Sequence, residues 1–281
     1  MNKKFLKTLS THSFLIFASL LSIFPFLWLI STALKGSGEN IFAYPPVMIP
    51  KEPTFENFTG VWKQIPFMLY FWNSLVVAGV TVVLNIILSA LCAYPLARME
   101  FKGKKIIFFS ILATIMIPFQ AIMLPIYIIT LKLHLTDTTS TTMGFLGLIL
   151  PFAVSAFGIF LMRQAFLGIP KEMEEAAFVD GCNVFQIWWK ILLPMLKPTM
   201  AVLAIFVFIG CWGEFLWPSI VLTKKTLYTL PVGINDLQGL FSANWRYIAA
   251  GSIISTVPII VFFLALQKYF ISGENEGAVK G

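Results

Sequence analysis

One polar segment between two apolar runs decides how this chain can fold. Residues 175–198 read EAAFVDGCNVFQIWWKILLPMLKP, and apolar runs flank them at 145–162 and 199–222. The chain has only 13 Asp and Glu, yet four of them lie within 172–180: Glu172, Glu174, Glu175 and Asp180. A cluster of acidic side chains beside apolar runs predicts a docking site for a soluble partner of complementary charge.

The apolar runs assign the whole chain to a membrane. Of its 281 residues, 58% are hydrophobic and 12% are charged, which is outside the usual range of soluble domains. Six runs are long enough to cross the apolar core of a bilayer: 14–34, 71–97, 106–131, 145–162, 199–222 and 247–267. They are continuous rather than alternating, which favours helices over a β-barrel. The sequence therefore predicts an all-α membrane protein, with six transmembrane helices in one transmembrane domain spanning 1–281.

The positive charges predict the orientation of these helices. If the N-terminus is inside, the inner segments hold thirteen of the 20 Lys and Arg residues and the outer segments hold seven. Because cytoplasmic segments carry the excess of Lys and Arg, both termini and the acidic segment are predicted to lie in the cytoplasm. No segment combines a basic cluster with interleaved aromatics, so nucleic acid is not a predicted partner.

The acidic segment itself predicts a helix–turn–helix at 170–193. Pro170 suits a first helical position, and the acidic residues after it lie near the positive end of the helix. Asp180-Gly181 is a turn signal, because Gly adopts positive φ without strain. Asn183 can cap the next helix, and Pro194 and Pro198 are expected to limit the continuation of that helix before the fifth span. From this pattern, the segment is either a docking element or an amphipathic connector lying on the membrane.

The same segment resembles the EAA signature of the membrane subunits of ATP-binding-cassette (ABC) importers. Glu175-Ala176-Ala177 is followed after three residues by Gly181, and after nine more by Ile191-x-Leu193-Pro194, which is the spacing of that family. Other segments are similar to the carbohydrate-uptake branch, which includes the maltose-type permeases. These are AYPLAR at 93–98, GIP at 168–170 and the C-terminal GAVKG at 277–281.

This resemblance implies a set of partners and a role for the acidic segment. The loop 170–193 would form coupling helices, between the fourth and fifth spans, that enter a cleft of a cytoplasmic ATPase. The residues implied in this coupling are Glu174, Glu175, Ala176, Ala177, Asp180 and Gly181. The implied partners are a homologous second permease subunit, two ATPase subunits that bind ATP and Mg, and an extracytoplasmic solute-binding protein. The substrate would be a sugar, the chain would carry no cofactor of its own, and it would lie among the lipids of a bacterial cytoplasmic membrane.

Polar residues inside the spans are candidates for the substrate pathway. Glu214 is the one ionisable residue well inside a predicted span, and a charge there is costly unless it is paired or hydrated. With Trp212 and Phe215 it offers a stacking surface and an acceptor for a sugar, or it bonds the partner permease. Relatives have Asn where this chain has Gly213, which weakens the substrate interpretation. Gln120 is a further candidate, although such amides more often bond neighbouring helices.

Other polar residues and prolines predict how the spans are joined. Asn85 and Ser89 are expected to bond neighbouring helices rather than a ligand. Pro118 and Pro151 lie inside predicted spans, where they either kink the helix or are tolerated by its neighbours.

Other function classes find little support in the sequence. No GxxxxGK[ST], HExxH or GxSxG motif is present, so neither a nucleotide site nor an enzyme active site is predicted. A secondary transporter would need coupling carboxylates within the bundle, and Glu214 by itself is poor support for one. The sequence thus predicts a permease subunit of an ABC sugar importer that works by alternating access. A secondary transporter and an importer of a non-sugar solute remain the alternatives.

Overall fold

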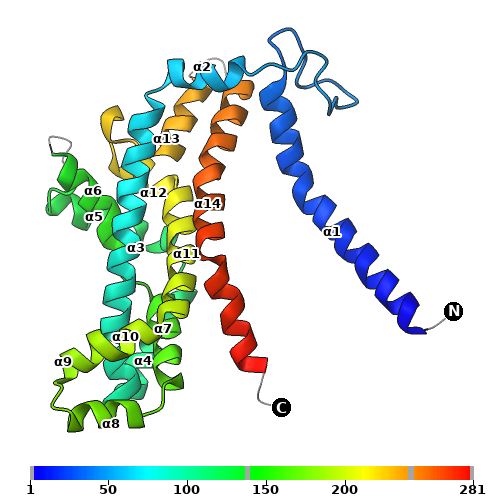
Figure 1. Cartoon of the computed structure of the whole chain (residues 1–281). Coiled ribbons are helices and arrows are strands. Elements are labelled where there is room, and N and C mark those ends of the chain that lie inside the picture. The colour runs from blue at the N-terminus through cyan, green and yellow to red at the C-terminus, as the bar shows by residue number, and fades with distance from the viewer. Residues whose placement is uncertain (1–2, 137–139, 240–243, 279–281) are drawn as a thin grey trace. The chain divides into compact units, whose positions relative to one another are not determined.

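Helices account for all the named elements in residues 3–136, 140–239 and 244–278, which are the residues that the computed structural model describes (Figure 1). The α-helices are α1 (Lys3–Leu34), α2 (Glu56–Gln64), α3 (Phe67–Arg98), α4 (Lys104–Ala113), α5 (Phe119–Lys132), α6 (Thr141–Ile149), α7 (Ala156–Gly168), α8 (Glu172–Val179), α9 (Val184–Gln186), α10 (Leu193–Met195), α11 (Lys197–Gly213), α12 (Leu216–Val221), α13 (Leu230–Asn235) and α14 (Trp245–Ala278). A π-helix, η3 (Ile187–Leu192), joins α9 to α10. The all-α prediction is confirmed.

The chain forms two compact units that interleave along the sequence. One comprises 1–68 and 233–257, and the other comprises 69–232 and 258–281. Neither unit is a continuous stretch of chain, and the assignment of 1–281 to one transmembrane domain stays a prediction.

The first unit is held together around the end of α1. The Asn57 side chain on α2 donates hydrogen bonds of 2.8 Å to the carbonyls of Ala33 and Lys35, so α2 is fixed to the residues where α1 ends. α2 also lies against the start of α14, since a Cβ on Gly60 would be 2.6 Å from the Tyr247 ring. A glycine is therefore needed at this crossing.

Three of the six predicted spans are continuous helices, and three are broken. Thr8–Leu34, Phe67–Arg98 and Trp245–Tyr269 are each long and apolar enough to cross a membrane. Three bent helix pairs also pass the test: Lys104–Met116 with Phe119–Lys132 at 102°, Thr141–Phe152 with Ala156–Gly168 at 56°, and Val184–Met195 with Lys197–Gly213 at 77°. The first two bends lie inside the third and fourth predicted spans, and the last lies just before the fifth. By length and composition the described residues thus hold three such helices, or the predicted six spans if each bent pair counts as one.

Proline chemistry explains the sharpest break. Pro118 lies between the two halves of the third span, where it precedes α5 in an extended conformation with ψ of 140°. The residue before it, Ile117, is also extended, as expected for a residue that precedes proline. Pro118 has no N–H to donate to a preceding turn, so the helix ends and restarts at this point. Of the two alternatives for the prolines, Pro118 thus follows the first and breaks its span.

A buried polar network fixes the break between α6 and α7. Asn85 on α3 donates to the carbonyl of Phe152 at 2.9 Å, and its Oδ1 accepts from the hydroxyls of Ser89 and Ser155 at 3.3 Å. Ser155 also caps α7, accepting from the backbone N–H of Gly158 at 3.0 Å. The backbone groups freed by the break thus find side-chain partners, as groups in an apolar medium must. Asn85 bonds neighbouring segments as predicted, whereas Ser89 bonds Asn85 on its own helix.

The fifth predicted span ends earlier than expected. α11 stops at Gly213, Glu214 is extended with ψ of 121°, and a separate helix α12 begins at Leu216. Pro218 accounts for the break, because it cannot donate to the carbonyl of Glu214 but is tolerated in the first turn of a new helix. The range 199–222 is therefore two helices, with Glu214 between them.

Candidate functional site

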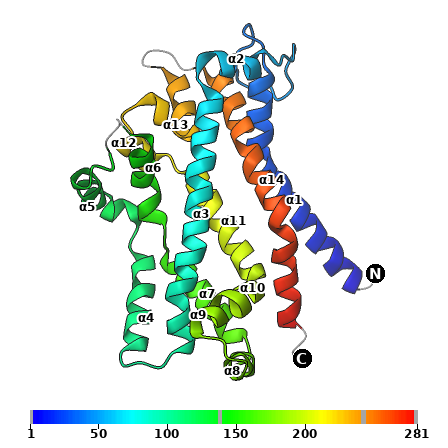
Figure 2. The same cartoon turned by 60° about the vertical axis from the view of Figure 1, so that its left-hand side comes forward.

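The acidic segment forms α8, at the end of the second unit where α3 ends and α4 begins (Figures 1 and 2). Its first turn contains Glu172, Glu174 and Glu175, whose charges are favourable at a helix N-terminus. The helix begins at Glu172, so the prediction that Pro170 opens it is wrong by two residues. The first hydrogen bonds of the helix run from the N–H groups of Glu174 and Glu175 to the carbonyl of Lys171.

The end of α8 is a Schellman turn built on Gly181. Gly181 has φ of +80°, and its N–H donates to the carbonyl of Phe178 at 3.0 Å. The N–H of Cys182 donates to the carbonyl of Ala177 at the same distance. These are the two bonds of a Schellman motif, which requires a left-handed residue at this position. The predicted turn at Asp180-Gly181 is confirmed.

The second helix starts as the sequence predicts and bends before the fifth span, between Pro194 and Pro198. Asn183 and Gln186 form a capping box, with both hydrogen bonds at 2.9 Å. The helical path then continues through η3 and α10, so Pro194 lies inside it and does not end it. The bend of 77° comes after Met195, at the start of α11.

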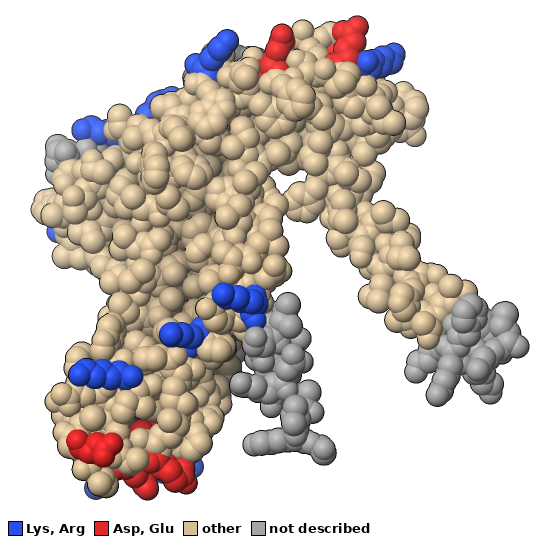
Figure 3. All heavy atoms as spheres, viewed as in Figure 1, with Lys and Arg blue, Asp and Glu red and all other residues tan. Residues whose placement is uncertain are grey.

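The side chains of α8 divide into a buried side and an exposed side. Glu174 and Ala177 are 8% and 5% exposed, and both face the interior of the second unit. Besides Met173, the exposed side chains at α8 combine acidic and apolar groups from six residues: Glu172, Glu175, Ala176, Phe178, Val179 and Asp180. Figure 3 shows a group of acidic side chains at the lower left, where Figure 1 places α8. We call these six residues the docking face.

Three residues of the docking face were not among the predicted coupling residues: Glu172, Phe178 and Val179. Three of the predicted residues are not part of it: Glu174, Ala177 and Gly181. Phe178 and Val179 are 50% and 88% exposed, although both are apolar. Glu174 is turned inward, where it contacts Arg98 at the end of α3. Ala177 packs in the core cluster with residues of α3, α7 and η3. Exposed apolar side chains beside acidic ones are typical of a protein-binding surface rather than of a solvated helix.

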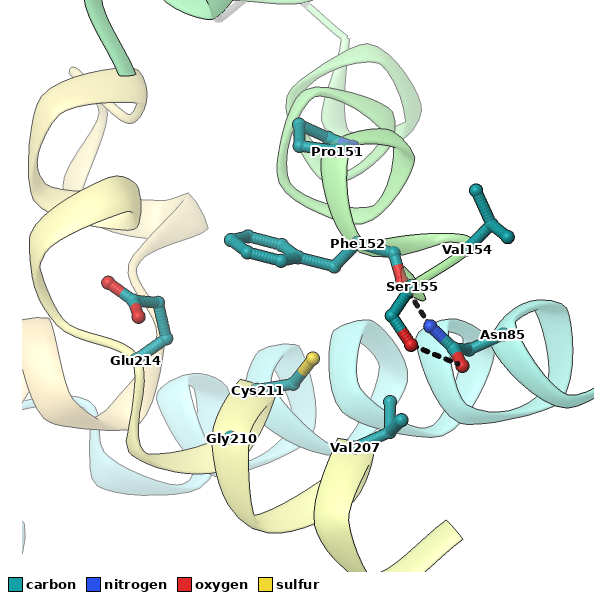
Figure 4. A pocket seen from close by; sticks show the side chains of 9 residues that line it. All are labelled: Asn85, Pro151, Phe152, Val154, Ser155, Val207, Gly210, Cys211 and Glu214. Atoms are coloured by element: carbon teal, nitrogen blue, oxygen red, sulfur yellow. Dashed lines mark hydrogen bonds between the residues drawn. The ribbon is translucent and has the colours of Figure 1, made fainter. Parts of the chain in front are cut away.

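The second candidate region is a pocket of about 320 Å³ beside the breaks in the helices (Figure 4). Its lining residues come from α3, the α6–α7 break and the end of α11: Asn85, Pro151, Phe152, Val154, Ser155, Val207, Gly210, Cys211 and Glu214. Glu214 is the one predicted pathway residue among them. Trp212 is 1% exposed and packs against Phe71 and Phe208, while Phe215 and Gln120 are exposed elsewhere. The predicted grouping of Trp212, Glu214 and Phe215 around one ligand is not seen.

Glu214 has a structural bond as well as a place in this pocket. Its Oε1 accepts from the backbone N–H of Trp217 at 3.0 Å, which satisfies one of the free N–H groups at the start of α12. The carboxylate therefore holds the two helices together across the break. No group of three His, Cys, Asp or Glu residues that could bind a metal occurs in the described parts of the chain.

We expect Glu214→Ala to destabilise the protein by about 0.5–2 kcal/mol, the usual effect of losing a capping side chain. Glu214→Gln retains an acceptor oxygen and should lose much less. Thermal unfolding of the purified protein in detergent would compare the two variants. Equal stability of Glu214→Ala and the unchanged protein would show that the cap contributes nothing.

Comparisons with known proteins identify the family. Residues 85–273 match the family described as binding-protein-dependent transport system inner membrane component, and the chain belongs to that family. It is similar to the arabinooligosaccharides transport system permease protein AraQ of Bacillus subtilis, with 38% identity over 95% of this chain and 94% of the relative. The diacetylchitobiose uptake system permease protein DasC of Streptomyces coelicolor is 32% identical, over 92% of each chain.

The fold has also been seen in a solved structure. A chain of a bacterial ABC transporter involved in the import of the acidic polysaccharide alginate superposes with a TM-score of 0.80. The match covers 96% of this chain and 99% of the other, at 24% identity. This chain therefore shares its helical fold with a chain of that transporter.

Proposed function

We propose that this chain is a permease subunit of a bacterial ABC importer for a sugar, and that the docking face receives an ATPase subunit. The observation that carries the proposal is the exposed acidic and apolar surface of α8, held by the Schellman turn at Gly181. The named relatives transport arabinooligosaccharides and diacetylchitobiose, which favours an oligosaccharide as the substrate class. The chain is a transporter subunit, and we assign ATP and Mg binding to its ATPase partners.

The remaining partners follow from the architecture of such importers. A second, homologous permease would complete the translocation pathway, and a solute-binding protein would deliver the sugar on the side opposite the docking face. The outer segment 223–246 is our candidate for that delivery surface, although 240–243 lie outside the described residues. With the docking face in the cytoplasm, both termini are also cytoplasmic. Residues 1–2 and 279–281 lie outside the described residues.

The mechanism we propose is alternating access driven by the ATPases. Closure of two ATPase subunits around ATP displaces α8 and biases the spans toward an outward-open state, and hydrolysis resets them. Shifting such an equilibrium almost completely needs about 5.5 kcal/mol of differential binding, which two ATP molecules can supply. The breaks at Pro118 and between α6 and α7 supply places where the spans can bend.

Transport measurements in vesicles test this function directly. With ATP inside and the cognate binding protein outside, we expect uptake of a labelled oligosaccharide that stops when ATP is withheld and survives an ionophore. An ion-driven secondary transporter would show the opposite pattern. A panel of labelled mono-, di- and oligosaccharides and amino acids would then identify the solute, and uptake of amino acids only would reject the sugar assignment.

A further inference from the structure

The buried side of α8 carries a charge that the docking face does not use. Glu174 lies between the exposed Met173 and Glu175, yet only 8% of it is exposed. An ionised side chain is rarely buried unless an opposite charge or hydrogen bonds compensate for the lost water. Its partners therefore indicate what this carboxylate does.

The partners of Glu174 lie at one end of α3. Arg98, the last residue of that helix, has its Nε 2.6 Å from Glu174 Oε1, and the two side chains are 5% and 11% exposed. Their orientation is not that of a hydrogen bond, so the contact is an ion pair. Tyr94, one turn earlier, donates more weakly from its hydroxyl to Oε2 at 3.4 Å. A cation at a helix C-terminus and an anion in a first helical turn are each favourable, so both helix dipoles support this pair.

Arg98 also contacts the residue that ends α7. Its Nη2 donates to the carbonyl of Ile169, so one guanidinium joins three helices: α3, α7 and α8. Glu174 is 76 residues from Arg98 along the chain. α8 follows α7 directly in the sequence, whereas several helices separate it from α3. The ion pair is thus a direct charged contact between the docking helix and the long helix α3.

α3 in turn reaches the pocket. Asn85 is thirteen residues before Arg98 on the same unbroken helix, a distance of about 20 Å at 1.5 Å per residue. It lines the pocket and bonds the carbonyl of Phe152 in the break between α6 and α7. A displacement of α3 at Arg98 would therefore act on the break that borders the pocket.

We propose that the Arg98–Glu174 ion pair carries the displacement of α8 into α3. In this role Glu174 is a positioning residue and does not touch the ATPase. The inference rests on the function proposed above, because it assumes that an ATPase displaces α8. The proposal gives two adjacent acids different roles. Glu175 faces the partner, while Glu174 connects the docking helix to the transport pathway.

Neutralising either member of the pair tests this role. We expect Glu174→Gln and Arg98→Gln to keep the ATPase bound, because the docking face is unchanged, and to keep ATP hydrolysis. The sugar transported per ATP hydrolysed should fall at least about fivefold, the lower end of typical coupling effects between sites. Glu100→Gln is the matched control, since it removes the exposed carboxylate of the Lys104–Glu100 pair near the same helix end and should leave the ratio unchanged.

A covalent link tests whether the contact is mechanical. Cysteines at both positions, Arg98→Cys with Glu174→Cys, would be placed in a chain whose Cys92, Cys182 and Cys211 are changed to Ala. A reducible bis-thiosulfonate spacer joining them should restore the transport ratio, and reduction should abolish it again. The cross-linking experiment also tests the proposal if the single variants fail to assemble.

Three results would overturn the proposal. A normal transport ratio in Glu174→Gln and Arg98→Gln would show that the pair carries no displacement. Loss of bound ATPase in proportion to lost uptake would place Glu174 in the docking contact instead. A spacer with no effect on the ratio would exclude a mechanical link. Failure of the unchanged complex to show any ATP-driven uptake is a different outcome, because it rejects the proposed function and not this link.

Discussion

Gly181→Val is expected to abolish uptake and to release the ATPase while the chain still inserts in the membrane. Gly181 has φ of +80°, a conformation that a β-branched residue adopts only with strain of about 1–3 kcal/mol. That strain opposes the Schellman turn, and with it the placement of Phe178, Val179 and Asp180 on the docking face. It corresponds to a change of about 5–150-fold in the docked population. The measurement is co-purification of the ATPase, normalised to the amount of permease in the membrane.

The chain offers a close control for backbone strain. Gly103 has φ of +86°, and a Cβ at Gly103 or Gly181 would meet no atom within 4 Å apart from those of its sequence neighbours. Gly103→Val therefore imposes the same kind of strain away from the docking face and should retain the ATPase. Gly181→Asn should retain part of it as well, because Asn tolerates a left-handed conformation. Full uptake by Gly181→Val would show that this loop does not couple the ATPase to transport.

Trp217→Ala is expected to cause the largest loss of stability, about 3–5 kcal/mol. Trp217 on α12 is completely buried, and the centroid of its ring lies 5.6 Å from that of the Phe119 ring in an edge-to-face arrangement. Its indole N–H donates to the carbonyl of Gly147 at 3.1 Å. The variant would lose the packing of the ring and the hydrogen bond together. Thermal unfolding of the purified protein in detergent measures the effect.

Two further variants separate packing from hydrogen bonding at this site. Trp217→Phe keeps much of the ring but removes the N–H, so we expect a smaller loss of about 1–3 kcal/mol for the unpaired carbonyl. Trp189→Ala removes an indole that is 50% exposed and should change the unfolding temperature little in detergent. Similar losses for Trp217→Ala and Trp189→Ala would contradict the assigned packing role.

Local signals in the sequence predicted the local structure well. Asp180-Gly181 predicted a turn and Asn183 predicted a cap, because these residue types act through their own backbone and nearest neighbours. The long apolar runs at 14–34, 71–97 and 247–267 predicted three helices for a similar reason: hydropathy is a property of a continuous stretch. The breaks were harder to predict, since the apolar run at 106–131 continues unchanged through Pro118.

Features that depend on distant contacts were not available from the sequence. Glu174 and Glu175 are adjacent acids in the same helical turn, and nothing in their type indicates which one is buried. The answer depends on Arg98, which is brought close only by the packing of α3 against α8. In the same way, the expected grouping of Trp212, Glu214 and Phe215 assumed one continuous helix. The break after Gly213 separates them instead.

The bond between Trp217 and Gly147 makes the residue types tolerated at positions 151 and 217 depend on each other. In an ordinary helix the carbonyl of Gly147 would accept from the N–H of the residue four positions later, but that residue is Pro151, which has none. The indole of Trp217 supplies the donor that Pro151 lacks. A lineage that replaced Pro151 would restore the helical donor and make the indole N–H redundant, while one that lost Trp217 first would leave a buried carbonyl unpaired. We therefore expect replacement of Pro151 to precede replacement of Trp217.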